Sequence, residues 1–168
     1  VRNIIYGKKS FEKLFGKYED LTLYFADVPI CFSQFPQFVT KFGFRYCVID
    51  RPEMVLTLKG IPREFVFQSP DGSRILCSHT IYGGIGFPGG GNHTVLSPGI
   101  FEDKIKTVKE RIDFVAKTSL VPITYFPDAA DWAFPTLNLL EFVHFWNEKI
   151  EKPKLTVSTH TKYFKELE

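Results

Sequence analysis

The sequence predicts an α/β fold in which parallel strands are joined by crossover helices. Short segments rich in β-branched and aromatic residues alternate along the chain with segments whose apolar residues recur at helical spacing. The chain has 168 residues, of which 44% are hydrophobic and 18 are Phe, so it can bury a sizeable core. This pattern is compatible with both a closed barrel and an open sheet.

The first part of the chain predicts a helix, a strand, a second helix and a second strand. Residues 9–16 are expected to form a helix that Gly16 ends. Residues 21–26 form a near-continuous apolar run, which is typical of a parallel strand buried on both faces. A helix over 34–42 and a strand over 44–50 follow. This order is that of a strand–helix–strand unit.

The middle of the chain predicts a β-hairpin. Residues 64–68 and 74–79 alternate between apolar and polar side chains, and Asp71-Gly72 lies between them as a turn signal. A glycine-rich segment over 83–99 follows and is expected to be a long loop. The hairpin is thus expected as an insertion among the parallel strands.

The last part of the chain repeats the alternation of helices and strands. Phe101, Ile105 and Val108 begin a helical apolar stripe that predicts a helix over 101–116. The remaining predicted elements are a strand over 120–126, a helix over 137–150, a strand over 154–159 and a helix over 160–167.

The charge and the cysteine content of the chain indicate which kinds of partner and which cellular compartment to expect. The net charge of +2 comes from 21 basic and 19 acidic side chains, which is too balanced to indicate a nucleic acid or an anionic membrane surface. No apolar run approaches the length of a membrane span. The sequence has three cysteines, Cys31, Cys47 and Cys77, and no CxxC motif, which favours a reduced, cytoplasmic setting. The chain opens without Met, which predicts a piece of a longer protein.

Carboxylates follow three of the predicted strands, and parallel strands deliver their carboxyl ends to one face of a sheet. Beside them lie Arg51 and Trp132, whose ring could stack on a sugar. Two carboxylates with such neighbours are suited to acid/base or nucleophilic work on a glycoside. Each acid has an alternative interpretation as a helix cap or turn former, and Arg51 as a structural ion-pair partner. The acids are Asp27, Asp50, Asp128 and Asp131.

Several stretches of the chain have the form of one family's motifs. RNIIYGKKSFEKLFG at 2–16 has the form R-x-x-x-Y-G-K-x-x-F-x-x-x-F-G. Residues 27–37 keep the Asp and the Pro-Gln of the form D-x-F-G-x-S-x-x-x-P-Q, with Pro29-Ile30 in place of Phe-Gly. The hairpin at 64–79 and the stretch 120–143 are also similar. On these stretches the chain resembles the N-terminal catalytic domain of glycoside hydrolase family 38, the α-mannosidases.

This resemblance implies a fold and a reaction. The fold would be a seven-stranded β/α barrel with parallel strands and an inserted β-hairpin, with residues 1–168 part of one catalytic barrel domain. The reaction would be retaining, zinc-dependent hydrolysis of α-mannosides. Asp27 would be both nucleophile and zinc ligand. Asp131 would be the acid/base, with Asp128 as the alternative.

The resemblance also implies substrate contacts and a metal site completed elsewhere. Arg51 would lie near both carboxylates and Tyr82 would contact the substrate; Trp132 is added because it adjoins Asp131. The family's other zinc ligands lie before and after these residues, and one carboxylate alone holds zinc poorly. The expected partners are a mannose-containing oligosaccharide and the remainder of the parent chain, and the isolated piece is expected to be inactive.

Two alternatives stay open. One is a non-catalytic, carbohydrate-binding relative that keeps the barrel fold. The other is a different α/β enzyme of the polysaccharide deacetylase kind, which needs a His-rich metal motif of its own. The four histidines are spread along the chain without HxH or HExxH spacing, which speaks against that last option.

Overall fold

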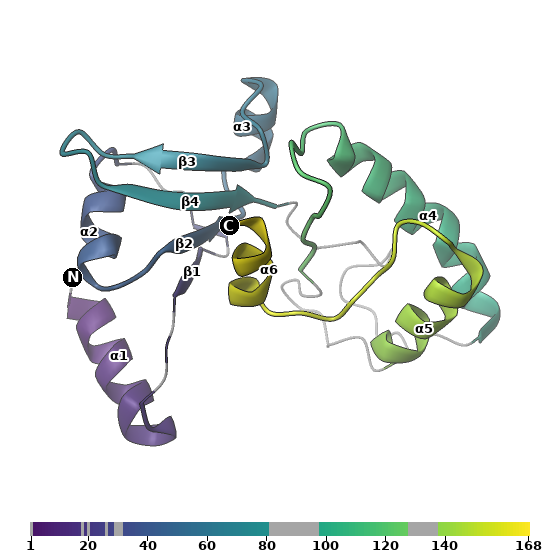
Figure 1. The fold of residues 1–168 in the computed structure, drawn as a ribbon, viewed down its shortest axis with the longest axis horizontal. Coiled ribbons are helices and arrows are strands. Elements are labelled where there is room, and N and C mark those ends of the chain that lie inside the picture. The colour runs from purple at the N-terminus through teal and green to yellow at the C-terminus, as the bar shows by residue number, and fades with distance from the viewer. Residues whose placement is uncertain are drawn as a thin grey trace.

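A computed structural model describes residues 2–17, 19, 21–25, 27–28, 32–80, 98–127 and 138–168. These residues form six helices and four strands (Figure 1). The elements are α1 (Arg2–Phe15), β1 (Thr22–Phe25), α2 (Phe35–Lys41), β2 (Tyr46–Ile49), α3 (Glu53–Leu58), β3 (Glu64–Gln68), β4 (Arg74–His79), α4 (Pro98–Ala116), α5 (Leu139–Lys149) and α6 (His160–Leu167).

The four strands form one mixed sheet in the order β1-β2-β4-β3. β2 lies in the centre and pairs in parallel with β1 on one side and with β4 on the other. β3 pairs antiparallel with β4 through the predicted hairpin. All four residues of β2 are buried, which fits its uniformly apolar sequence YCVI.

Helices cover both faces of this sheet. On one face, Phe35 and Val39 of α2 pack against Cys47, Ile49 and other apolar residues of the strands. On the other face, Tyr163 and Phe164 of α6 pack against alternate residues of β2, and the Phe164 ring stacks on the Tyr46 ring with centroids 4.9 Å apart. Strand alternation therefore divides the buried side chains of β2 between the two helices.

α4 and α5 pack on each other and form a core of their own (Figure 1). Phe101 and Val108 of α4 meet Phe142 and Trp146 of α5, and all four side chains are buried. The Trp146 indole N–H donates to the Pro153 carbonyl at 2.7 Å, which holds the chain after α5 against that helix. No helix in the described part of the chain is long and apolar enough to cross a membrane.

The expectation of a seven-stranded parallel barrel is wrong for the described residues, which form an open sheet of four strands with one antiparallel strand. The predicted strands at 120–126 and 154–159 are not formed, and neither segment pairs with a strand of the described residues. Their backbone groups bind side chains instead. Leu155 N–H donates to the Asn147 side-chain oxygen at 2.9 Å, and the Asn147 amide donates to the Leu155 carbonyl at 2.8 Å. The class α/β remains compatible with this architecture.

The other predicted elements are present with shifted ends. The hairpin and the helices at 101–116, 137–150 and 160–167 are confirmed as β3–β4, α4, α5 and α6. α1 begins earlier than predicted, at Arg2. α3 was not predicted, because its six residues, EMVLTL, are too few to display a helical period. Of the loop predicted over 83–99, residues 83–97 lie outside the described residues, whereas residues 98 and 99 belong to α4 rather than to a loop.

Candidate active site

Asp27 and Arg51 meet at the carboxyl ends of two neighbouring parallel strands. The β1–β2 ladder ends at the pair Phe25–Ile49, and beyond it the Asp50 N–H donates to the Phe25 carbonyl at 3.3 Å. Asp27 follows β1 and Arg51 follows β2. The Arg51 Nε donates to Asp27 Oδ1, which forms an ion pair. This edge is where ligands bind in parallel α/β folds.

The backbone at Asp27 is unusual. Its φ is +54°, which is the left-handed region that side chains other than Gly rarely adopt and that Asp tolerates better than most. The side chains of Asp27 and Arg51 are 44% and 48% exposed. A ligand can therefore reach the carboxylate, and the ion pair contributes at most about 1 kcal/mol to folding.

Asp50 also lies at this edge, but its carboxylate has a different environment. Asp50 is completely buried, and the Tyr24 hydroxyl donates to its Oδ2 at 2.8 Å. Its Oδ1 has no hydrogen-bond partner within the described residues. Burial is the main cause that raises the pKa of Asp50 above its ordinary value, and the Tyr24 hydrogen bond opposes this. Asp50 is therefore an enclosed acid beside an accessible one.

An aromatic cluster adjoins the Tyr24–Asp50 hydrogen bond. The Tyr24 ring lies 4.9 Å from the His160 ring, and the Tyr125 ring lies 4.8 Å from it on a T-shaped contact. His160 Nε2 and the Tyr125 hydroxyl form a hydrogen bond. His160 begins α6, whose N-cap Thr159 accepts a hydrogen bond from the Lys162 N–H. Sequence analysis missed this cluster because its members come from three separate segments of the chain. The local signal was limited to strand alternation, which puts the side chain of Tyr24 on the same face of the sheet as that of its register partner Val48.

The other predicted site residues lie outside the described residues. They are Tyr82, Asp128, Asp131 and Trp132. Of the predicted site, the structure thus places Asp27 and Arg51, and brings these two together. His79 is described but faces the α2 side of the sheet, where its Nε2 lies 3.2 Å from the Ile61 carbonyl oxygen and burial lowers its pKa. Its burial and its contact with the Ile61 carbonyl fit a structural role for His79.

Among the described residues at this edge, the carboxylate of Asp27 is accessible to a metal ion, whereas that of Asp50 is buried. Within them no group of three or more His, Cys, Asp or Glu side chains is arranged to hold a metal ion. A zinc ion here would need ligands from elsewhere, because structural and catalytic zinc sites use three or four protein ligands. No chemical step is therefore assigned to a metal on these residues.

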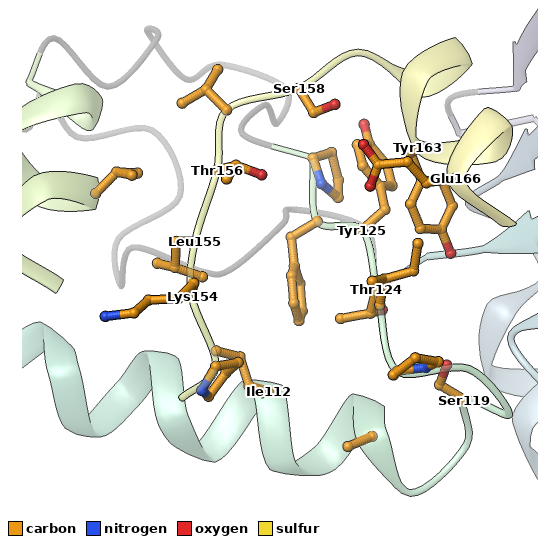
Figure 2. A pocket seen from close by; sticks show the side chains of 18 of the residues that line it. Ile112, Ser119, Thr124, Tyr125, Lys154, Leu155, Thr156, Ser158, Tyr163 and Glu166 are labelled. Carbon is orange, nitrogen blue, oxygen red and sulfur yellow. The ribbon is translucent and has the colours of Figure 1, made fainter. Parts of the chain in front are cut away.

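A cavity of about 490 Å³ lies between α4, α5 and the extended segments 119–127 and 153–158 (Figure 2). Figure 2 shows Thr124 and Tyr125 on one wall, Leu155 and Thr156 on the facing segment, and Glu166 near one end. Neither Asp27 nor Arg51 is among the described residues that line it. The cavity is therefore separate from the ion pair at the sheet edge.

Comparison with known proteins supplies the family. A model of the glycosyl hydrolases family 38 N-terminal domain matches residues 1–168. No curated protein and no solved structure matches the chain significantly. Because the family match covers every residue, the chain belongs to the N-terminal domain of glycosyl hydrolase family 38.

Proposed function

We propose that this chain is part of the catalytic domain of a retaining α-mannosidase in which Asp27 is the nucleophile. Membership of a glycoside hydrolase family supports a glycoside substrate. The observation that carries the proposal is the Asp27–Arg51 contact, an accessible carboxylate held by a guanidinium at the carboxyl ends of β1 and β2. An exposed acid in a left-handed turn at that edge is placed for a ligand rather than for packing.

In the proposed reaction, an Asp27 carboxylate oxygen attacks the anomeric carbon and the glycosidic bond breaks. Asp131 gives its proton to the departing oxygen, and the sugar is left as an ester on Asp27. Asp131 then takes a proton from water, which attacks the anomeric carbon and releases the sugar and the Asp27 carboxylate. Asp128 is the alternative acid/base. Retention follows from two displacements at the same carbon.

Arg51 has a positioning role in this proposal. Its Nε donates to one oxygen of Asp27, which leaves the other oxygen for attack and fixes the plane of the carboxylate. Tyr82 and Trp132 are proposed as substrate contacts. Asp27 is also proposed as one ligand of a zinc ion whose other ligands lie outside residues 1–168. When bound, zinc would hold sugar hydroxyls rather than activate water.

The test is hydrolysis of p-nitrophenyl α-mannoside by the full-length protein, measured with and without a chelator and with zinc content determined in parallel. We expect about one zinc per chain and hydrolysis that the chelator abolishes. Asp27→Ala should lose both hydrolysis and tight zinc. Asp71→Ala is the control, because Asp71 lies in the hairpin turn, where it accepts a hydrogen bond from the Ser73 N–H at 3.1 Å.

Retained zinc and normal turnover in Asp27→Ala would refute the assignment of Asp27. Absence of both zinc and hydrolysis in the wild-type protein would favour the second candidate, a carbohydrate-binding relative without catalysis. This second candidate is favoured by one observation: Pro29-Ile30 replaces the family's Phe-Gly two residues after the proposed nucleophile.

A further inference from the structure

We propose that Tyr24 and Asp50 are positioning residues whose hydrogen bond fixes the ends of β1 and β2 relative to each other and so holds the Asp27–Arg51 pair. The inference rests on the proposed function of Asp27. It adds two residues to that site that do not themselves contact the substrate.

The register connects the two pairs of residues directly. Tyr24 lies opposite Val48 in the parallel ladder, so Tyr24, Val48 and Asp50 point to the same face of the sheet. Arg51 comes immediately after Asp50, and Asp27 comes three residues after Tyr24. The Tyr24–Asp50 bond of 2.8 Å therefore spans the two strands one step before the point where the ion pair spans them again.

Burial distinguishes the two interactions. The Asp27–Arg51 pair is almost half exposed, so water competes for both partners and the pair alone fixes its geometry weakly. The Asp50 carboxylate is completely buried and has the Tyr24 hydroxyl as the one hydrogen-bond donor found for it within the described residues. Hydrogen bonds to ionised or enclosed carboxylates are short and directional. The enclosed bond can therefore set the strand spacing on which the exposed pair depends.

The Tyr24 ring also contacts helix α6. It contacts the His160 ring at the start of α6, and His160 is hydrogen-bonded to Tyr125. Nearby, the Thr22 and Thr161 hydroxyl oxygens lie 2.8 Å apart, which joins β1 to α6 a second time. The end of β1 is thus tied both to β2 and to α6, although β1 is an edge strand of the sheet.

The test compares Tyr24→Phe with Tyr163→Phe in the full-length protein. The two tyrosines offer a matched pair, because the Tyr163 hydroxyl donates to the Glu64 carboxylate, also at 2.8 Å, on the same face of the sheet. We expect Tyr24→Phe to lower kcat about tenfold with KM changed less than about twofold, since misplaced catalytic groups cost turnover rather than binding. Tyr163→Phe should leave both constants within about twofold.

Two further variants and one activity-independent measurement complete the test. Asp50→Asn keeps an acceptor for the Tyr24 hydroxyl and should retain most of kcat, whereas Asp50→Ala should lose as much as Tyr24→Phe. Hydrogen exchange, followed on the peptides that carry Asp27 and Arg51, should be faster in Tyr24→Phe than in Tyr163→Phe.

The outcomes separate this inference from the proposed function. If the wild-type protein hydrolyses mannoside and Tyr24→Phe behaves like Tyr163→Phe in both kcat and exchange, the positioning role is overturned while the function stands. If the wild-type protein is inactive, the proposed function fails. Exchange then decides the positioning role alone, and equal exchange in the two variants overturns it.

Discussion

Asp27 has a left-handed backbone conformation and an exposed side chain. A substitution that keeps this backbone conformation can therefore change the chemistry of the side chain without changing the stability of the fold. The φ of Asp27 is +54°, and its carboxylate accepts a hydrogen bond from the Arg51 Nε. Asn tolerates left-handed backbone about as well as Asp, and the ion pair that it would replace is half exposed.

We therefore predict that Asp27→Asn abolishes hydrolysis while the free energy of unfolding changes by less than about 1 kcal/mol. Urea unfolding and mannoside hydrolysis, measured on the same preparation, test this. A stability loss of several kcal/mol would contradict it, because Asp27 would then be a structural residue rather than an accessible one.

Asp50, unlike Asp27, is expected to affect the stability of the fold, and this effect should depend on pH. Burial raises the pKa of Asp50, so the folded protein keeps this proton to a higher pH than the unfolded chain does. The resulting stabilisation is complete below the unfolded pKa of about 3.9 and is lost as the pH rises through the folded pKa.

Asp50→Asn does not titrate at this position, so we expect its stability relative to the wild-type protein to increase as the pH rises above about 4, with a slope of at most about 1.4 kcal/mol per pH unit. Urea unfolding of both proteins between pH 4 and pH 8 provides the difference. His79, whose pKa burial lowers, titrates in both proteins and cancels from this difference. A difference that is flat or falls with pH would contradict the buried state of Asp50.

At the scale of elements, β2 and β4 are the best protected part of the described sheet. Cys47 and Cys77 are register partners in these strands, both are completely buried, and both are free thiols. The neighbouring Cys77 and burial raise the pKa of the Cys47 thiol, so the reactive thiolate is suppressed.

We expect alkylation of Cys47 and Cys77 to be more than about 100-fold slower in the native protein than in denaturant, because both thiols react only after opening of the sheet. Peptide-level mass spectrometry after timed iodoacetamide treatment measures both rates. Native labelling as fast as denatured labelling would show that β2 and β4 are not the protected centre.

Asn147 holds the segment after α5 at Leu155, beyond the point where Trp146 binds Pro153. Asn147 binds both the N–H and the carbonyl of Leu155, in the place where a strand ladder would have done so. We predict that Asn147→Ala lowers the free energy of unfolding by about 1–3 kcal/mol, because it leaves partly buried backbone groups without partners. Glu148→Ala, at the next and exposed position, is the control and should change it by less than about 0.5 kcal/mol. Equal effects would refute the role of Asn147.

For the whole molecule, the sequence predicted local elements well and their assembly poorly. Asp71-Gly72 fixed the hairpin turn, and the apolar stripe that begins at Phe101 predicted α4, because both signals are contained in a few neighbouring residues. Whether the extended segments 120–126 and 154–159 join a sheet depends on which edges are open and on partners such as Asn147. The sequence pattern leaves a closed barrel and an open sheet both possible. The barrel that the family resemblance implies is not what the described residues form, which is a four-stranded open sheet.

The residues of the candidate site could likewise be predicted from the sequence only in part. Asp27 and Arg51 were placed at one edge by the rule that parallel strands share their carboxyl ends, and the structure brings them into contact. The Tyr24–His160–Tyr125 cluster could not be predicted, because no local pattern relates residues so far apart in the chain. The roles of Asp131, Tyr82 and Trp132 remain predictions from the family resemblance.

Covalent trapping is the measurement that tests the central claim most directly. The full-length protein would be treated with a fluorinated mannosyl fluoride, which slows release of a glycosyl–enzyme ester, and its peptides would then be analysed by mass spectrometry. We predict one mannosyl adduct per chain, on the peptide that carries Asp27, and none in Asp27→Asn. An adduct on another carboxylate, or hydrolysis that proceeds with inversion and without any adduct, would contradict Asp27 as the nucleophile.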